Sequence, residues 1–314
     1  MNILVFGKNG QLGRAFQEQL QQTSFQAVNN IRFVGKNECD FSKLDQLKIL
    51  LQDFRPQLMI NAAAYTSVDE AESELDIALA INATAPEMMA KYAAHHCATL
   101  LHFSTDYVFD GSKQGVYTEA DQTNPLSVYG KSKEAGELAI AKVFSKNAGG
   151  QYAILRASWV YGDGRNFIHT ILRLAKERSE LRVIDDQIGV PTSARWLADL
   201  SLHLVLDDAE QIRQFISGIY HAVPRGQTNW HSLACLAVKV ALDADQKLQA
   251  SFADIVPIPT SDYPLLARRP MNSLMSTDKL KFELERLGLV SKLPHWNTPW
   301  DQQVAYYIKR LLAT

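Results

Sequence analysis

The chain has 314 residues, of which 46% are hydrophobic and 21% charged, and its formal net charge is −2. A chain of this length can bury a large core. The two charge signs are intermixed, which offers no basic stripe for nucleic acid and no polybasic patch for lipid. We therefore expect a globular protein whose partner is a small molecule, and neither nucleic acid nor a membrane.

The cysteines and the N-terminal residues exclude several further classes. Cys39, Cys97 and Cys235 are widely spaced and never form a CxxC pair, so the sequence predicts neither a disulfide framework nor a metal site. The chain opens on MNILVFG without a basic, cleavable leader, and no segment reaches about 18 consecutive apolar residues. We expect a cytoplasmic location.

Short apolar runs alternate with helical patterns along the first half of the chain. The run NILVF at 2–6 ends at a glycine, and helical periodicity follows from residue 11 to about 22. Strands separated by helices predict an α/β fold with a doubly wound parallel (Rossmann) sheet, whose ligand binds beyond the carboxyl ends of the strands. Further strands are expected over 31–35, 57–61, 98–103 and 152–156, and helices over 44–54, 75–97 and 129–145.

The alternation weakens after residue 156. Helices are expected over 167–179 and 194–209, strands over 181–184 and 218–223, and an irregular Pro-rich segment over 256–270. We predict that residues 1–165 plus 191–225 form a dinucleotide-binding domain, to whose sheet the strand at 219–222 returns. Residues 166–190 plus 226–314 are expected to form a second, smaller mixed lobe that binds the substrate.

Three glycines, Gly7, Gly10 and Gly13, follow the first strand and open the first helix. One glycine permits the tight turn, one lets the backbone approach a pyrophosphate, and one allows close helix packing. The free N–H groups of the helix then favour an anion, so we expect a dinucleotide here rather than a purely structural turn. The second strand ends in VGKN, where Lys36 replaces the acidic residue that would hold an adenine ribose. Lys36 suits a 2′-phosphate, which favours NADPH and leaves NADH possible; the alternative is a solvated loop lysine.

Tyr129 and Lys133 lie four residues apart on a predicted helix and therefore on one face. About one such pair is expected by chance in this composition, but this one follows the strand that ends at Thr105. Ketone reduction needs a proton donor, and a nearby ammonium lowers the pKa of a phenol. We expect Tyr129 to donate the proton, Lys133 to activate it and hold the nicotinamide ribose, and Thr105 to position the substrate oxygen. The alternatives are that Ser104 and Thr105 only satisfy a strand end, and that Tyr107 is only a packed aromatic.

The three-residue glycine spacing resembles that of the short-chain dehydrogenase/reductase superfamily. Eight segments, in order and over nearly the whole chain, resemble its dTDP-4-dehydrorhamnose reductase family. They are NILVFGKNGQLG, CDFS, NAAAYTSVDEAE, HFSTDYVFDG, VYGKSKEAGE, LRASWVYG, DDQIGVPT and RRPMNS. The resemblance implies NAD(P)H-dependent reduction of a sugar nucleotide, dTDP-4-dehydro-L-rhamnose, at its 4-keto group to give dTDP-L-rhamnose for cell-surface polysaccharide.

The resemblance also implies roles for individual residues. Thr105, Tyr129 and Lys133 match the catalytic members by residue type. Asp106, Tyr107 and Trp159 are expected at the sugar, and Arg269 at the nucleotide phosphates; a core aromatic and a surface arginine are the alternatives for Trp159 and Arg269. The implied cofactor contacts are Gly7, Gly10, Gln11, Leu12, Gly13, Lys36, Asp40, Phe41, Ala62, Ala63, Ala64, Tyr65, Thr66, Phe103, Tyr129 and Lys133.

Some features narrow this interpretation. Ala15 stands where some family members carry a magnesium-binding Glu, so metal-linked dimerisation is not expected, although a homodimer remains possible. Tyr107 replaces the Glu that sugar-nucleotide dehydratases use, which disfavours dehydration, and 4-epimerases also rank below a reductase. Another sugar-nucleotide ketoreductase, or a non-catalytic subunit resembling methionine adenosyltransferase beta, is the remaining alternative.

Overall fold

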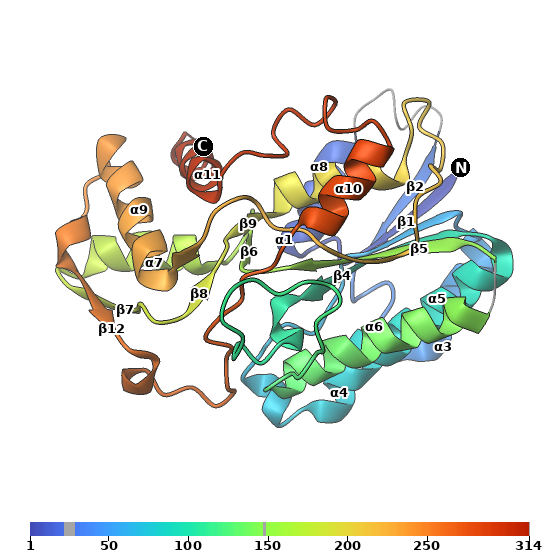
Figure 1. Cartoon of the computed structure of the whole chain (residues 1–314), viewed down its shortest axis with the longest axis horizontal. Coiled ribbons are helices and arrows are strands. Elements are labelled where there is room, and N and C mark those ends of the chain that lie inside the picture. Colours follow the sequence, from blue (N-terminus) through green and yellow to red (C-terminus); the bar gives the residue numbers. More distant parts are fainter. Residues whose placement is uncertain (22–28, 147–148, 314) are drawn as a thin grey trace.

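A six-stranded parallel sheet forms the centre of the computed structural model, which describes residues 1–21, 29–146 and 149–313 (Figure 1). The strand order is β10-β5-β4-β3-β1-β2. The strands are β1 (Asn2–Phe6), β2 (Asn30–Val34), β3 (Leu58–Asn61), β4 (Thr99–Thr105), β5 (Gln151–Ala157) and β10 (Gly218–His221). The chain crosses from β1 to β2 on one side and then to β3 on the other, so the direction of winding changes between β1 and β3. This confirms the predicted doubly wound α/β fold, and ligands bind such sheets at this switch point.

Helices cover both faces of the sheet (Figure 1). One face carries α3 (Leu44–Phe54), α4 (Leu75–Leu79), α5 (Ala85–His96) and α6 (Val128–Lys146), and the other carries α1 (Gln11–Leu20), α8 (Ala194–Val205) and α10 (Asp278–Arg286). Side chains alternate between the two faces: Leu101 and Leu155 join one core cluster, and Leu100 and Ile154 join the other. Burial on both faces explains why these strands appear in the sequence as continuous apolar runs.

The strand predicted near 219–222 returns to the sheet as expected, because Ile219 of β10 pairs with Ile154 of β5. Helix boundaries were predicted less well. The expected helix over 75–97 is interrupted by a π-helical turn at Ala80–Thr84, directly before Pro86, which has no amide hydrogen to donate to the preceding turn. The helix expected to reach 209 ends at Val205, since the next residues turn around the Asp207 carboxylate. The expected end of the first helix near residue 22 lies outside the described residues.

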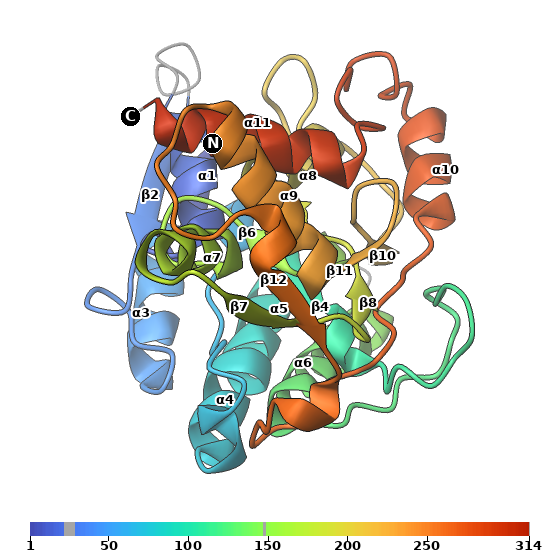
Figure 2. The same cartoon turned by 90° about the vertical axis from the view of Figure 1, so that its left-hand side faces the viewer.

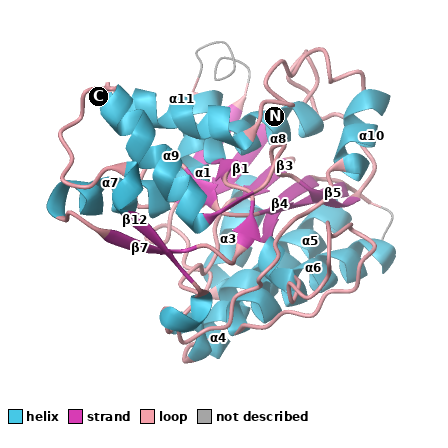
Figure 3. Cartoon of the chain, turned by 60° about the vertical axis from the view of Figure 1, so that its left-hand side comes forward, coloured by secondary structure: helices cyan, strands magenta, loops and turns pink. Residues whose placement is uncertain are grey.

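A second group of elements packs beside the carboxyl ends of the strands (Figures 2 and 3). Its core cluster is formed by α7 (Phe167–Glu177), β7 (Leu181–Ile184), α9 (Trp230–Asp243), β12 (Ile255–Ile258) and α11 (Trp300–Leu312). Strand β12 lies within the segment expected to be irregular, and it pairs in parallel with β7. It contains Pro257, which an edge strand tolerates because one side needs no amide donor. Short ladders join β6 (Val160–Tyr161) to β9 (Thr192–Ser193), and β8 (Ile188–Gly189) to β11 (Thr228–Asn229).

One part of the expected second lobe packs elsewhere. Leu280 and Leu284 of α10, together with Leu289 and Leu293, belong to the core cluster that contains Tyr220 of the central sheet. The apolar face of this segment, which the sequence assigned to the second lobe, therefore covers the sheet. Among the residues that the structure describes, no helix is long and apolar enough to cross a membrane.

Candidate active site

A cavity of about 850 Å³ lies at the carboxyl ends of β1, β3 and β4, a volume typical of small-molecule sites. Gly13, Tyr65 and Arg269 are the three predicted site residues that do not line it. The cavity brings together the other predicted residues, namely Gly7, Gly10, Gln11, Leu12, Lys36, Asp40, Phe41, Ala62, Ala63, Ala64, Thr66, Phe103, Thr105, Asp106, Tyr107, Tyr129, Lys133 and Trp159.

The glycine turn has the geometry that its sequence predicts. Gly7 has a φ of +84°, and a Cβ there would lie 2.6 Å from the carbonyl oxygen of Ala62. A Cβ on Gly13 would lie 2.0 Å from the carbonyl oxygen of Gly7, so Gly13 packs α1 against the turn and does not face the cavity. Gly10 precedes α1, and no side chain caps the helix. The first amides of α1 therefore remain available at the cavity to an anion such as a pyrophosphate.

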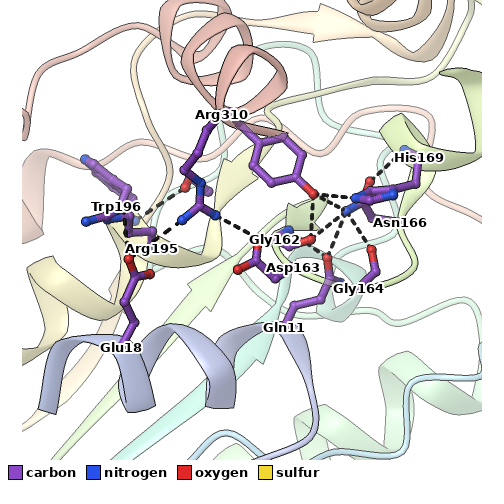
Figure 4. A network of polar contacts seen from close by, with 12 residues as sticks. Gln11, Glu18, Gly162, Asp163, Gly164, Asn166, His169, Arg195, Trp196 and Arg310 are labelled. Carbon is purple, nitrogen blue, oxygen red and sulfur yellow. Dashed lines mark hydrogen bonds and ion pairs between the residues drawn. The ribbon is translucent and has the colours of Figure 1, made fainter. Parts of the chain in front are cut away.

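The side chain of Gln11 joins this turn to the loop at 162–166, between β6 and α7 (Figure 4). Its Oε1 accepts hydrogen bonds from the amide of Gly162 at 2.7 Å and from Asn166 at 3.3 Å. Asn166 also donates to the carbonyl of Gly162 at 2.8 Å, and the hydroxyl of Tyr307 donates to the same oxygen at 2.8 Å. Arg310 forms an ion pair with Asp163 at 2.7 Å.

Sequence reasoning did not predict that this loop reaches the cavity. Asp163, Gly164 and Arg165 all line it. They follow β6 and lie far from the glycine turn in the sequence. The motif NF at 166–167 marks only a helix N-cap, in which Asn166 accepts from the amide of His169. Arg14 was also missed, and it lines the same part of the cavity.

The far end of the cavity is formed around Asp40. Hydrogen bonds from the hydroxyl and amide of Ser42 lower the pKa of the Asp40 carboxyl, with smaller help from the charge of Lys36. Phe41 is buried against Phe6, with ring centroids 5.2 Å apart. Lys36 is exposed at the rim of the cavity, so its ammonium is accessible to a phosphate group.

Thr105 and Tyr129 meet on the cavity wall. Thr105 ends β4, and its hydroxyl accepts from the amide of Tyr107 at 3.2 Å and donates to Asp106 at 3.0 Å. Burial raises the pKa of Tyr129 to about 12, while a hydrogen bond with Thr105 acts in the opposite direction. The expected lowering of the Tyr129 pKa is therefore wrong, because burial of the phenol dominates.

The amine of Lys133 points towards β4. It donates to the carbonyl of Phe103 at 2.6 Å and lies 3.4 Å from Nε2 of His102. Burial lowers the pKa of Lys133 to about 8, and the charge of Glu137 opposes this shift. Lys133 is only 2% exposed yet lines the cavity, so its charge lies at the cavity wall with little contact with solvent.

Two stacked tryptophans cover the side of the cavity that faces the second lobe. Trp159 and Trp230 have ring centroids 3.8 Å apart, and both line the cavity. Trp159 has a φ of +47°, a conformation that costs a bulky residue energy. A Cβ on Gly189 would lie 2.6 Å from the Trp159 ring, so Gly189 leaves the space that the indole occupies. Trp230 begins α9 and was not predicted, because a single Trp carries no signal of its own.

Arg269 and Tyr65 are engaged outside the cavity. The guanidinium of Arg269 forms a two-pronged ion pair with Asp69, at 2.7 and 3.2 Å. The hydroxyl of Tyr65 donates to Glu74 at 2.6 Å.

Tyr107 lies next to Tyr129, with ring centroids 5.7 Å apart. Ser104 is a further cavity residue without an assigned role, and its buried hydroxyl has no hydrogen-bond partner in the part of the chain that the structure describes.

Comparison with known proteins identifies the family of this chain. A family model described as the RmlD substrate binding domain matches residues 1–310. The dTDP-4-dehydrorhamnose reductase of Burkholderia thailandensis is 39% identical over 302 residues, covering 94% of this chain and 95% of the relative. The crystal structure of the Clostridium acetobutylicum enzyme of the same name superimposes with a TM-score of 0.84 at 32% identity, covering 99% and 100% of the two chains. The Bacillus anthracis enzyme, solved in complex with NADP, gives a TM-score of 0.82 at 30% identity and covers 98% and 99%.

Proposed function

This chain belongs to the dTDP-4-dehydrorhamnose reductase family, and we propose that it reduces the 4-keto group of dTDP-4-dehydro-L-rhamnose with NADPH. One observation carries the proposal. A single cavity brings an uncapped, glycine-opened helix N-terminus together with a Thr and a Tyr beside a buried lysine. The first feature suits a dinucleotide pyrophosphate, and the second suits proton donation to a ketone.

The residues present fit a nicotinamide dinucleotide. The amides that follow Gly10 are free to hold its pyrophosphate, and the unpartnered Ser104 hydroxyl marks a buried polar position that a ligand group would satisfy. Asp40 and Phe41 are assigned to the adenine end, and Lys36 to a 2′-phosphate, in keeping with the NADP bound by the Bacillus anthracis relative. When bound, the reduced cofactor would supply the hydride to carbon 4 of the sugar.

Proton transfer is assigned to Tyr129. Its raised pKa keeps the phenol protonated at neutral pH, which is the state that a proton donor needs before the reaction. Thr105 holds the keto oxygen by a hydrogen bond, and the charge of Lys133 stabilises the phenolate that remains after the proton has left. The Lys133 amine is also assigned to the nicotinamide ribose.

Substrate contacts are proposed for Trp159, Asp106 and Tyr107. Trp159 offers an apolar face to the sugar ring, and Asp106 and Tyr107 lie next to Thr105 and Tyr129. Arg269 remains a candidate for the nucleotide phosphates, because an anion could compete with Asp69 for a guanidinium. Tyr65 remains a candidate for the cofactor strand edge through its backbone alone, since its hydroxyl is held by Glu74. The homodimer and the cytoplasmic location stay predictions.

The test is conversion of the proposed substrate. Purified protein would be incubated with NADPH and dTDP-4-dehydro-L-rhamnose, and the product would be identified by NMR. We expect dTDP-L-rhamnose with equimolar loss of NADPH. Binding of NADPH without any conversion would favour the non-catalytic subunit, and conversion of other keto sugars in preference would favour a different ketoreductase.

A further inference from the structure

A buried chain of three polar side chains lies behind the cavity wall. Asn61 ends β3 and pairs in register with His102 of β4. Their side chains are 1% and 0% exposed, and Nδ2 of Asn61 lies 3.0 Å from Nδ1 of His102. On the other side of the ring, Nε2 of His102 lies 3.4 Å from Nζ of Lys133. The cavity is lined by Lys133 and by the neighbouring residues Phe103 and Ser104, and not by His102, so the contact with Lys133 connects His102 to the site.

The backbone fixes which tautomer this histidine adopts. Oδ1 of Asn61 accepts a hydrogen bond from the amide of Ala63 at 3.2 Å, which directs the NH₂ group of the amide towards His102. Nδ1 of the ring must therefore accept, and in a neutral imidazole the proton then sits on Nε2. Burial, together with the nearby charge of Lys133, holds the pKa of His102 well below its ordinary value, so the ring is neutral.

The proton on Nε2 of His102 affects which charge state of Lys133 is favoured. An ammonium group only donates, so it would face the Nε2–H of His102 with a second donor. A neutral amine would instead accept from Nε2–H while donating to the carbonyl of Phe103, which lies 2.6 Å away. His102 thus works against the charged form of Lys133.

Two other ionisable groups face the amine from its own helix. Glu137 lies one turn further along α6 and favours the ammonium, but its carboxylate is shared with Arg156 of β5, at 2.6 Å. Tyr129 lies one turn before Lys133 and is neutral until it loses its proton. The charge of Lys133 is therefore a balance between Glu137 on one side and His102 with burial on the other.

We propose that His102 is a positioning residue which, held by Asn61 with its proton on Nε2, disfavours the ammonium of Lys133 and so sets the pH at which the site loses that charge. This proposal rests on the proposed function, in which the charge of Lys133 acts at Tyr129. The arrangement leaves the amine able to change its charge near neutral pH, where a freely solvated lysine would stay charged.

The tautomer can be tested without any turnover. The full chain labelled with ¹⁵N-histidine would be examined by NMR at pH 7, and the His102 signals would be assigned by their absence in His102→Gln. We expect the chemical shifts of a neutral ring protonated at Nε2. In Asn61→Asp the carboxylate accepts from Nδ1–H, so protonation should move to Nδ1. A ring protonated at Nδ1 in the parent protein would overturn the proposal and leave the proposed reductase activity untouched.

The effect on Lys133 can be tested by the pH dependence of kcat. His102→Phe keeps a ring but removes the Nε2–H donor, so it should move the alkaline limb of kcat upward by about one pH unit, the size expected for loss of one hydrogen bond to the neutral form. Thr99→Val is a matched control, because it removes a buried hydroxyl from the start of the same strand, where Gln151 donates to it at 3.1 Å. That control should lose stability without moving the limb.

An unchanged alkaline limb in a folded His102→Phe protein would overturn the proposal. Absence of turnover in the parent protein would count against the proposed function instead, because the NMR result does not depend on turnover. If His102→Phe does not fold, the tautomer in the parent protein and in Asn61→Asp still decides the question.

Discussion

The side chain of Gln11 accepts a hydrogen bond from the backbone amide of Gly162 at 2.7 Å, across 151 residues of sequence. This contact joins the N-terminus of α1, the proposed pyrophosphate site, to a loop that is also contacted by the C-terminal helix α11 (Figure 4). Because Tyr307 of α11 donates to the carbonyl of the same Gly162, the last helix of the chain helps to fix the first turn of the cofactor site.

Tyr307→Phe tests this connection. The change removes a hydroxyl that bonds to Gly162 and contacts Asn166 and His169, so the loop beside the proposed pyrophosphate site should be held less firmly. We expect the Kd for NADPH, measured by calorimetry, to rise roughly 2- to 10-fold, as for one lost hydrogen bond. Tyr306→Phe is the control, because that neighbour is 63% exposed. Equal affinities in the two variants would contradict the expectation.

Tyr129→Phe tests the assigned proton donor. The ring and its packing against Tyr107 are retained, and only the acidic hydroxyl is lost. We expect kcat to fall by about 10²- to 10⁴-fold, the usual contribution of general acid catalysis, with the Kd for NADPH nearly unchanged. Steady-state kinetics and calorimetry on the same preparation would separate the two effects, and near-normal turnover would show that another group donates the proton.

Lys36→Ala tests cofactor choice. Lys36 is exposed at the cavity rim, and a charge-assisted hydrogen bond to a 2′-phosphate contributes about 1.5–3 kcal/mol. We expect kcat/KM for NADPH to fall roughly 10- to 100-fold and kcat/KM for NADH to stay the same. Lys48→Ala, an exposed lysine on α3, should change neither. A parallel fall for both cofactors in Lys36→Ala would mean that the lysine does not meet the 2′-phosphate.

Asp106→Asn tests a pH-dependent cost in stability. Burial raises the pKa of Asp106 to about 6, against hydrogen bonds from Ser273 and Thr105 that lower it, whereas an unfolded chain has a value near 3.9. The stability that this group contributes is therefore fully present below about pH 4 and is lost as the pH rises through about 6.

The amide carries no charge, so the Asp106→Asn variant should gain stability over the parent protein as the pH rises from about 4 to 7, by roughly 2 kcal/mol at the upper end. The measurement is the Tm of both proteins across this range, and the KM for the keto sugar should rise if Asp106 contacts it. Asp53→Asn, an exposed change on α3, should show no such gain. A gain that is independent of pH would exclude the buried carboxylate as its cause.

Much of the sheet could be predicted because its strands are buried on both faces and punctuated by glycine or polar turns. The run NILVF and the segment ATLLHF became β1 and β4 nearly as expected. In the second lobe, α7 and β7 formed nearly where they were expected, but elements that depend on distant partners were not predicted. Strand β12 contains Pro257 and exists only by pairing with β7, and α10 covers the sheet with an apolar face that local sequence does not distinguish.

The residues that line the cavity could be predicted where they lie at strand ends or at the start of the first helix, because the topology brings those points together. Residues that reach the cavity from later parts of the chain, such as Asp163, Arg165 and Trp230, could not be predicted. The pairing of Arg269 with Asp69 was also hidden, because the two residues are 200 positions apart. The resemblance to a family suggested the types of residues, but only the three-dimensional contacts show how Lys133 and Tyr129 are buried.

The most direct test of the central claim is the loss of NADPH absorbance when dTDP-4-dehydro-L-rhamnose is added to the purified protein, run beside the same assay with NADH. The account predicts oxidation of NADPH that depends on the sugar nucleotide and is faster than oxidation of NADH. A protein that binds NADPH but oxidises neither cofactor in the presence of the keto sugar would contradict it.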